Sequence, residues 1–314
     1  MMDKPHYSED LPSTKKTTGR KKQSSPDSLW TFLIVIGLIL IVFGMVSLAY
    51  LLLGMPSLGS GFTPGDPTAT PPGENITDPN YLAGKTAYDA GRYQEVIARM
   101  NDVIKINPDL APTYWYRGMA NWYLGNNQEA MNDMQQALKL DPDYALAYAD
   151  RGLVYSTLGD SERAMADWQK ALSLDPSLAK VHYNIGVAYE KEGNYRQALH
   201  AFETALEIDP SRANTWKNQG IAQFELGQFE DCIDSAAKAI ELQDDLWGSY
   251  YVRGTCHAFL GEYEEAITYL NVYIREEPND ACGWQNRGSA YRFLGNKRQA
   301  DSDLRRAEAL RNCE

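Results

Sequence analysis

The residue types that most often carry catalysis or bind metals are scattered along this chain of 314 residues. The four histidines, His6, His182, His200 and His257, lie far apart in the sequence and match no zinc-ligand spacing. The sequence also lacks a glycine-rich phosphate loop and the strained turn that presents a nucleophilic serine. We therefore predict no enzymatic activity, no catalytic or metal-binding residue and no cofactor.

The elements that carry these residues repeat with a fixed period. Glycine occurs every 34 residues from Gly84 to Gly288, and a second glycine set runs with the same period from Gly91 to Gly295. A fixed period over residues 77–314 is typical of a solenoid. Within each period the apolar spacing is helical, the second glycine falls in a turn, and proline usually closes the second helix. The predicted units begin at residues 77, 111, 145, 179, 213, 247 and 281.

The pattern within a unit resembles the tetratricopeptide repeat. With each unit numbered from 1 to 34, that family favours a large residue at position 4, Gly at 8, Ala at 20, an aromatic residue at 24, Ala at 27 and Pro at 32. The third unit supplies Tyr148, Gly152, Ala164, Trp168, Ala171 and Pro176 at these places. The resemblance implies an all-α fold: a right-handed α-solenoid of seven 34-residue helix-turn-helix repeats. We call the first helix of each unit helix A and the second helix B.

Antiparallel helices A and B bring position 8 opposite position 24, so Gly152 leaves room for Trp168. The same geometry places position 7 opposite position 23. Three units have Arg at 7 and Asp at 23, which predicts structural ion pairs between the two helices; an arginine that binds a ligand is the weaker alternative. The three pairs are Arg117 with Asp133, Arg151 with Asp167, and Arg287 with Asp303.

The resemblance implies that helix A lines a concave groove, chiefly through positions 2, 5, 9, 12 and 13. We predict a partner-binding site in two halves: an exposed aromatic cluster in the second unit, and a more polar half in units 4 and 5. A peptide with an apolar segment and an acidic or carboxylate group would suit both halves. The alternative is that the aromatic residues bridge neighbouring helices and the lysines are solubilising charge. The site residues are Trp115, Met119, Trp122, Tyr123, Lys180, Tyr183, Asn184, Lys217, Asn218, Ile221 and Phe224.

The seventh unit carries two further predictions. Elsewhere, positions 21 and 28 of helix B are apolar, as in Leu199 and Leu206, but this unit has Asp301 and Glu308 there. A polar outer face is typical of a terminal cap, so we expect a monomeric solenoid. Cys282 and Cys313, at positions 2 and 33, are candidates for a disulfide, with two free thiols as the alternative.

The amino-terminal quarter has a different character. Residues 1–28 form a basic tail that we expect to be disordered, and residues 29–53 contain no charged residue. A helix of 25 residues spans about 37 Å, enough for a bilayer core of about 30 Å. We predict a single transmembrane helix at 29–53, with a cleaved signal peptide as the alternative. Residues 54–76 contain five Gly and five Pro and read as a spacer.

The charge on the two flanks of residues 29–53 sets the expected topology. Five Lys or Arg residues lie from Lys15 to Lys22, and none occurs between Lys22 and Lys85. The positive-inside rule then places the amino terminus in the cytoplasm and the repeats on the extracytoplasmic side. Asn75 begins the only Asn-x-Ser/Thr sequon and is a possible glycosylation site.

The net charge of −12 lies wholly in residues 77–314, which argues against nucleic acid as the main partner. Together these features predict a membrane-anchored scaffold or assembly factor that binds a protein or peptide in the groove. One alternative is a permanently docked subunit of a membrane-bound complex. Another is an enzyme without a recognisable motif that uses the repeats as a platform.

Overall fold

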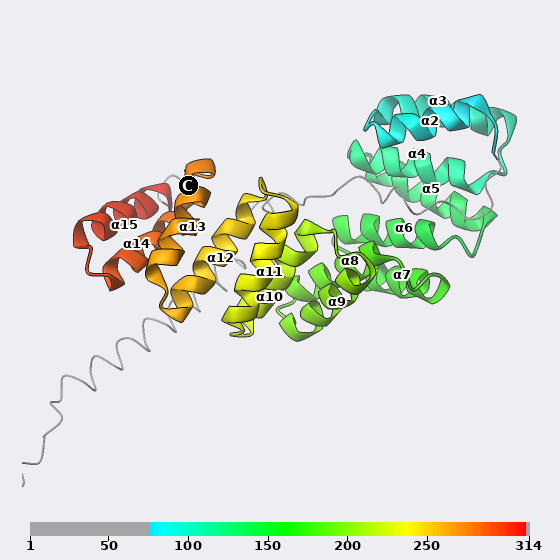
Figure 1. The fold of residues 1–314 in the computed structure, drawn as a ribbon. Helices are drawn as coiled ribbons and strands as arrows, with labels where there is room; N and C mark the ends of the chain where they lie inside the picture. The colour runs from blue at the N-terminus through cyan, green and yellow to red at the C-terminus, as the bar shows by residue number, and fades with distance from the viewer. Residues whose placement is uncertain (1–75, 312–314) are drawn as a thin grey trace, which may run out of the picture. The chain divides into compact units, whose positions relative to one another are not determined.

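The computed structural model describes residues 76–311, and this part of the chain is all α-helical (Figure 1). Its fourteen helices form seven antiparallel pairs, and each pair packs against the next pair along the chain. Helix A of the seven units is α2 (Pro79–Asp89), α4 (Ala111–Tyr123), α6 (Ala145–Thr157), α8 (Ala179–Lys191), α10 (Ala213–Glu225), α12 (Trp247–Leu260) and α14 (Ala281–Phe293). Helix B is α3 (Tyr93–Ile106), α5 (Asn127–Leu140), α7 (Ser161–Leu174), α9 (Tyr195–Ile208), α11 (Phe229–Leu242), α13 (Tyr263–Glu276) and α15 (Lys297–Arg311).

Two glycines in each unit allow the helices to pair. The turn glycine, such as Gly159, has φ of +81°, a conformation that side chains other than glycine rarely adopt. The helix A glycine allows a close approach: a Cβ atom on Gly152 would lie 2.6 Å from Trp168 Nε1, and one on Gly186 would lie 2.5 Å from the Phe202 ring. Both aromatic residues are buried in the core that each unit forms between its two helices.

All three Arg–Asp pairs join helix A to helix B of the same unit through two hydrogen bonds each. Arg151 donates from Nε and Nη2 to Asp167 over 2.7 and 2.8 Å, and the pairs in units 2 and 7 have the same fork geometry. The aspartates are buried, so each pair satisfies a charge that would otherwise be costly. In unit 6 the guanidinium of Arg253 lies 4.3 Å from the centroid of the Tyr269 ring, so a cation–π contact takes the place of the ion pair.

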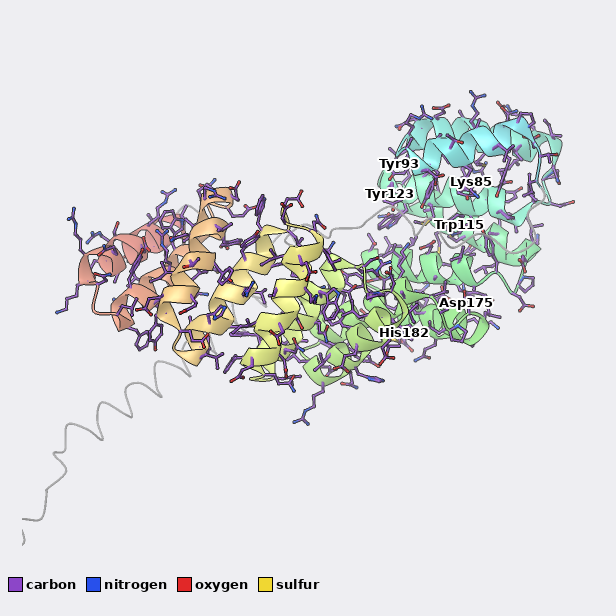
Figure 2. The ribbon with its side chains drawn as sticks, in the orientation of Figure 1. Lys85, Tyr93, Trp115, Tyr123, Asp175 and His182 are labelled. Atoms are coloured by element: carbon purple, nitrogen blue, oxygen red, sulfur yellow. A yellow bond between two sulfur atoms is a disulfide. The ribbon has the colours of Figure 1, made fainter. Side chains whose placement is uncertain are left out.

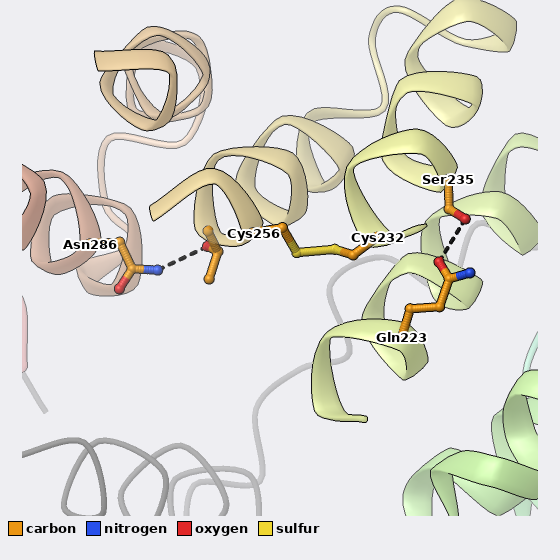
Figure 3. Close-up of a disulfide and its surroundings, with 6 residues drawn as sticks. Gln223, Cys232, Ser235, Cys256 and Asn286 are labelled. Atoms are coloured by element: carbon orange, nitrogen blue, oxygen red, sulfur yellow. Dashed lines mark hydrogen bonds between the residues drawn. A yellow bond between two sulfur atoms is a disulfide. The ribbon is translucent and has the colours of Figure 1, made fainter. Parts of the chain in front are cut away.

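A disulfide joins unit 5 to unit 6, which the sequence analysis did not predict. Cys232 of α11 and Cys256 of α12 are bonded, with their Cα atoms 6.4 Å apart (Figure 3). They occupy position 20 of one unit and position 10 of the next, where other units have small side chains such as Ala198 and Ala222. Helix B of one unit therefore approaches helix A of the next closely enough for a short bridge. The predicted bond between Cys282 and Cys313 stays a prediction because Cys313 lies outside the described residues.

The outer face of α15 is polar, as predicted for a cap: Asp301 and Glu308 are exposed, whereas Leu206 at the equivalent place on α9 is buried. Several other predictions fall on residues 1–75, outside the described part of the chain: the basic tail, the transmembrane helix at 29–53, most of the spacer, and Asn75. Among the helices of residues 76–311, none is both long enough and apolar enough to cross a bilayer.

Candidate functional site

The aromatic half of the predicted site is only partly accessible. Trp115 is 6% exposed and Met119 is fully buried, so the prediction of solvent-facing residues is wrong for these two. Residues on both sides cover Trp115: its ring packs against Tyr88 of α2 and against Tyr144 at the end of unit 2, and its indole Nε1 donates a 2.9 Å hydrogen bond to Asp150 of α6. Both side chains belong to one hydrophobic cluster that includes residues of units 1, 2 and 3.

Trp122 and Tyr123 are half-buried and also contact neighbouring units. Trp122 Nε1 donates to Thr157 Oγ1 of α6 over 3.2 Å. Tyr123 stacks on Tyr93 of α3, with ring centroids 4.4 Å apart and planes at 5°; both residues are labelled in Figure 2. These contacts match the alternative in which the aromatic residues bridge neighbouring helices, and they reduce the area that a partner could cover.

The positive charge predicted for the other half is also paired within the protein. Lys180 Nζ of α8 lies 2.8 Å from Asp150 Oδ1, so this buried carboxylate accepts hydrogen bonds from units 2 and 4 at once. Lys180 is thus neutralised inside the protein, and Lys217 is the other lysine predicted to face an acidic ligand.

Units 4 and 5 bring their predicted residues together on the helix A side. Asn218 Nδ2 of α10 donates to Tyr183 Oη of α8 over 3.3 Å, and Asn286 makes the same contact to Tyr251, two units further along. In each case the asparagine at position 6 reaches the tyrosine at position 5 of the preceding unit, 35 residues earlier. Burial raises the pKa of Tyr183 to about 12, so its hydroxyl stays neutral.

Asn184 is the member of this series that lacks a match. The residue 35 positions earlier is Ala149, which offers no polar side chain. Asn184 is 6% exposed, and its Nδ2 atom has no hydrogen-bond partner in the part of the chain described by the structure. A buried donor without an acceptor is costly, so Asn184 marks α8 as a place where the fold leaves hydrogen-bonding capacity unused.

Ile221 and Phe224 supply the apolar part of this surface. Both are partly buried on α10 and pack against the core around the Cys232–Cys256 bond. Phe224 also contacts Phe259 of α12 edge to face, with centroids 4.9 Å apart. The helices that carry the amides of Asn184 and Asn218 thus also carry aromatic and aliphatic side chains.

Two acidic residues on the same helices were missed by the sequence analysis: Glu190 at position 12 of α8 and Glu225 at position 13 of α10. Burial raises the pKa of Glu190 to about 7; Lys217 and Lys191 oppose this shift, whereas Glu225 adds to it. Burial lowers the pKa of Lys217, and Glu190 opposes that shift. The second predicted lysine therefore has an acidic neighbour as well. The sequence did contain a signal for Glu190 and Glu225: both are acidic residues at positions 12 and 13, which line the predicted groove, in two successive units.

We call Tyr183, Asn184, Glu190, Lys217, Asn218, Ile221, Phe224 and Glu225 the α8–α10 surface. Its polar groups could orient a peptide, and its aromatic and aliphatic side chains could cover apolar residues. Across residues 76–311, no three His, Cys, Asp or Glu side chains are placed to hold a metal ion.

Comparison with solved structures shows the same fold in other proteins. YrrB, a TPR protein with an unusual peptide-binding site, is 25% identical, with a TM-score of 0.52 over 56% of this chain and 91% of its own. One chain of the APC/C hetero-tetramer Cut9–Hcn1 gives 17% identity and a TM-score of 0.62 over 76% of this chain and 47% of its own, so this protein spans about half of that chain. PilW, a widely conserved type IV pilus biogenesis factor, gives 22% identity and a TM-score of 0.56 over 63% of this chain and 92% of its own.

No curated protein matches the sequence. Four repeat models do match, and together they cover more than half of the 314 residues. Models of the tetratricopeptide repeat match residues 179–212, 218–281 and 283–312, and a TPR repeat model matches 122–159 and 157–193. The chain belongs to the tetratricopeptide repeat family.

Proposed function

We propose that the protein is a membrane-tethered scaffold that holds a peptide segment of a protein partner on its α8–α10 surface. Tetratricopeptide folds bind protein or peptide partners, and YrrB has a peptide-binding site. The single observation that carries the proposal is Asn184, a buried amide with an unused donor on α8, the helix that also carries Tyr183. A peptide carbonyl group would supply the acceptor that Ala149 cannot.

The proposal concentrates binding in units 4 and 5. In unit 2, Trp115 and Met119 are committed to the core, so a partner could reach only parts of Trp122 and Tyr123. We therefore expect the aromatic residues of unit 2 to contribute mainly to stability. The substitution Trp122→Ala should then lower the melting temperature and leave capture of the partner by the folded protein nearly unchanged.

Site-specific cross-linking tests the proposed surface. A photoreactive amino acid replaces Ile221 on α10 in one variant and the exposed Glu203 on α9 in the control, and the full chain is expressed in its own cells. We expect discrete protein adducts from position 221 and none of the same mass from position 203. Adducts from neither position, or the same adducts from both, would show that this surface is not where the protein works.

We further propose that residues 29–53 anchor the protein and that its repeats are extracytoplasmic. The basic residues before this segment support that orientation. The Cys232–Cys256 bond supports it independently, because structural disulfides persist in oxidising compartments and are rare in the cytosol. Protease added to spheroplasts should digest the repeats and spare the amino-terminal tail. Full protection of the repeats in spheroplasts, with digestion after lysis, would refute this topology.

A further inference from the structure

Position 12 of one unit regularly contacts position 13 of the next unit on the helix A side. The two residues are always 35 apart, and the contact recurs with different chemistry. Two of the contacts are aromatic, with ring centroids 6.2 and 4.9 Å apart, and one is a hydrogen bond of 3.2 Å. These pairs are Tyr88 with Tyr123, Phe224 with Phe259, and Trp122 with Thr157.

Glu190 and Glu225 occupy the same two positions in units 4 and 5, so the register brings two carboxylates together. Both are partly buried, and burial raises the pKa of each. Two like charges at a contact position oppose each other, whereas the equivalent pairs attract. Nothing in the packing of the other units requires acids here.

One oxygen of this pair has no partner. Glu190 Oε2 is buried and accepts no hydrogen bond from residues 76–311. Lys217 and Lys191 are near enough to favour the charged form of Glu190, yet in this described region neither forms an ion pair with it within 4 Å. Glu190 therefore offers a buried oxygen that accepts no hydrogen bond, next to a second carboxylate. A cation that donated to this oxygen would form a charge-assisted hydrogen bond.

We propose that Glu190 and Glu225 receive a cationic side chain, arginine or lysine, from the peptide bound on the α8–α10 surface. This inference rests on the proposed function and names the chemistry of its ligand. It reverses the sequence-based expectation of an acidic ligand, because Lys180 is paired with Asp150 and Lys217 is accompanied by Glu190.

Charge complementarity over a longer range supports the same ligand. Residues 77–314 carry the whole net charge of −12, so a basic segment is attracted before contact and an acidic one is repelled. A guanidinium group can donate to both carboxylates at once, which favours arginine over lysine. The nearby Tyr183, Ile221 and Phe224 would cover the apolar residues that flank the cation.

The test is a selection from a phage-displayed library of random 12-residue peptides on the full chain, purified in detergent and held at pH 8. Four forms are compared: the wild type, Glu190→Gln, Glu225→Gln, and a control with both Glu203 and Glu207 changed to Gln. The control residues are exposed on α9, so this variant loses the same kind of charge away from the surface. Circular dichroism melts establish that all four forms are folded.

We expect the wild type and the control to enrich peptides with Arg or Lys at one position, flanked by apolar residues. For the best of these peptides, replacing that residue with Gln should weaken binding at least about tenfold, and Glu190→Gln in the protein should do the same. Enrichment of peptides without a basic preference would overturn the inference and leave the proposed function intact. No enrichment of any peptide would overturn both.

Discussion

Removal of the Cys232–Cys256 bond gives a stability change that the structure allows to be estimated. Changing both cysteines to Ala introduces the pair that units 4 and 5 already have at these positions, Ala198 and Ala222, so packing is little disturbed. The two cysteines are 24 residues apart, and closing a loop of this length constrains the unfolded chain by about 3.5 kcal/mol. The loss should fall on the contact between units 5 and 6, because each repeat contacts only its neighbours.

Urea denaturation of the full chain, with and without a phosphine reductant, measures this change. The double variant should unfold at lower urea than the oxidised wild type and should match the reduced wild type. Cys282→Ala serves as the matched control and should leave the response to reductant intact. Alkylation of the unfolded, unreduced wild type followed by peptide mapping is decisive: labelling of Cys232 and Cys256 under these conditions would refute the bond. The same map shows whether Cys282 and Cys313 are joined.

Three further perturbations test the fold and its charges. Asp167→Asn removes the partner of the half-buried Arg151 and should cost about 2 kcal/mol in the free energy of unfolding, measured by urea titration; no loss would refute a structural role for the pair. The folded-state pKa of Glu190, about 7, exceeds its ordinary value of 4.5, so its contribution to stability is present below about pH 4.5 and is lost as pH rises through 7. Glu190→Gln should therefore be more stable than the wild type at pH 8, by at most about 3 kcal/mol, and little different at pH 4; equal melting temperatures at both pH values would contradict this. Leucine at both Asp301 and Glu308 should make the protein self-associate in sedimentation, whereas an unchanged monomer would refute the cap.

The repeat architecture could be predicted from the sequence because its signals are local and periodic. Gly152 and Trp168 lie 16 residues apart across one turn, as do Arg151 and Asp167, so a single antiparallel helix pair determines both contacts. Seven copies of the same period then make the pattern unmistakable. None of these inferences required knowledge of how one unit sits on the next.

The candidate site was harder to predict because it depends on contacts between units. Trp115 packs against Tyr88 of the preceding unit and donates a hydrogen bond to Asp150 of the next unit, and Lys180 is paired with the same Asp150. Trp115 lies 35 residues before Asp150, and Lys180 lies 30 residues after it. These spacings differ from the 34-residue period, so the repeat pattern alone did not reveal the contacts. Cys232 and Cys256 gave a similar signal, since both replace small residues at positions where adjacent units touch.

Hydrogen–deuterium exchange of the full chain, with and without a peptide selected on it, tests the central claim most directly. The account predicts slower exchange in α8 and α10 when peptide is bound, centred on the segments that contain Asn184, Glu190 and Lys217. The helix B elements of the same two units, α9 and α11, should exchange at unchanged rates, because their outer faces lie away from the α8–α10 surface. Protection confined to α9 and α11, or to unit 2, would contradict the claim that this protein holds its partner on helix A of units 4 and 5.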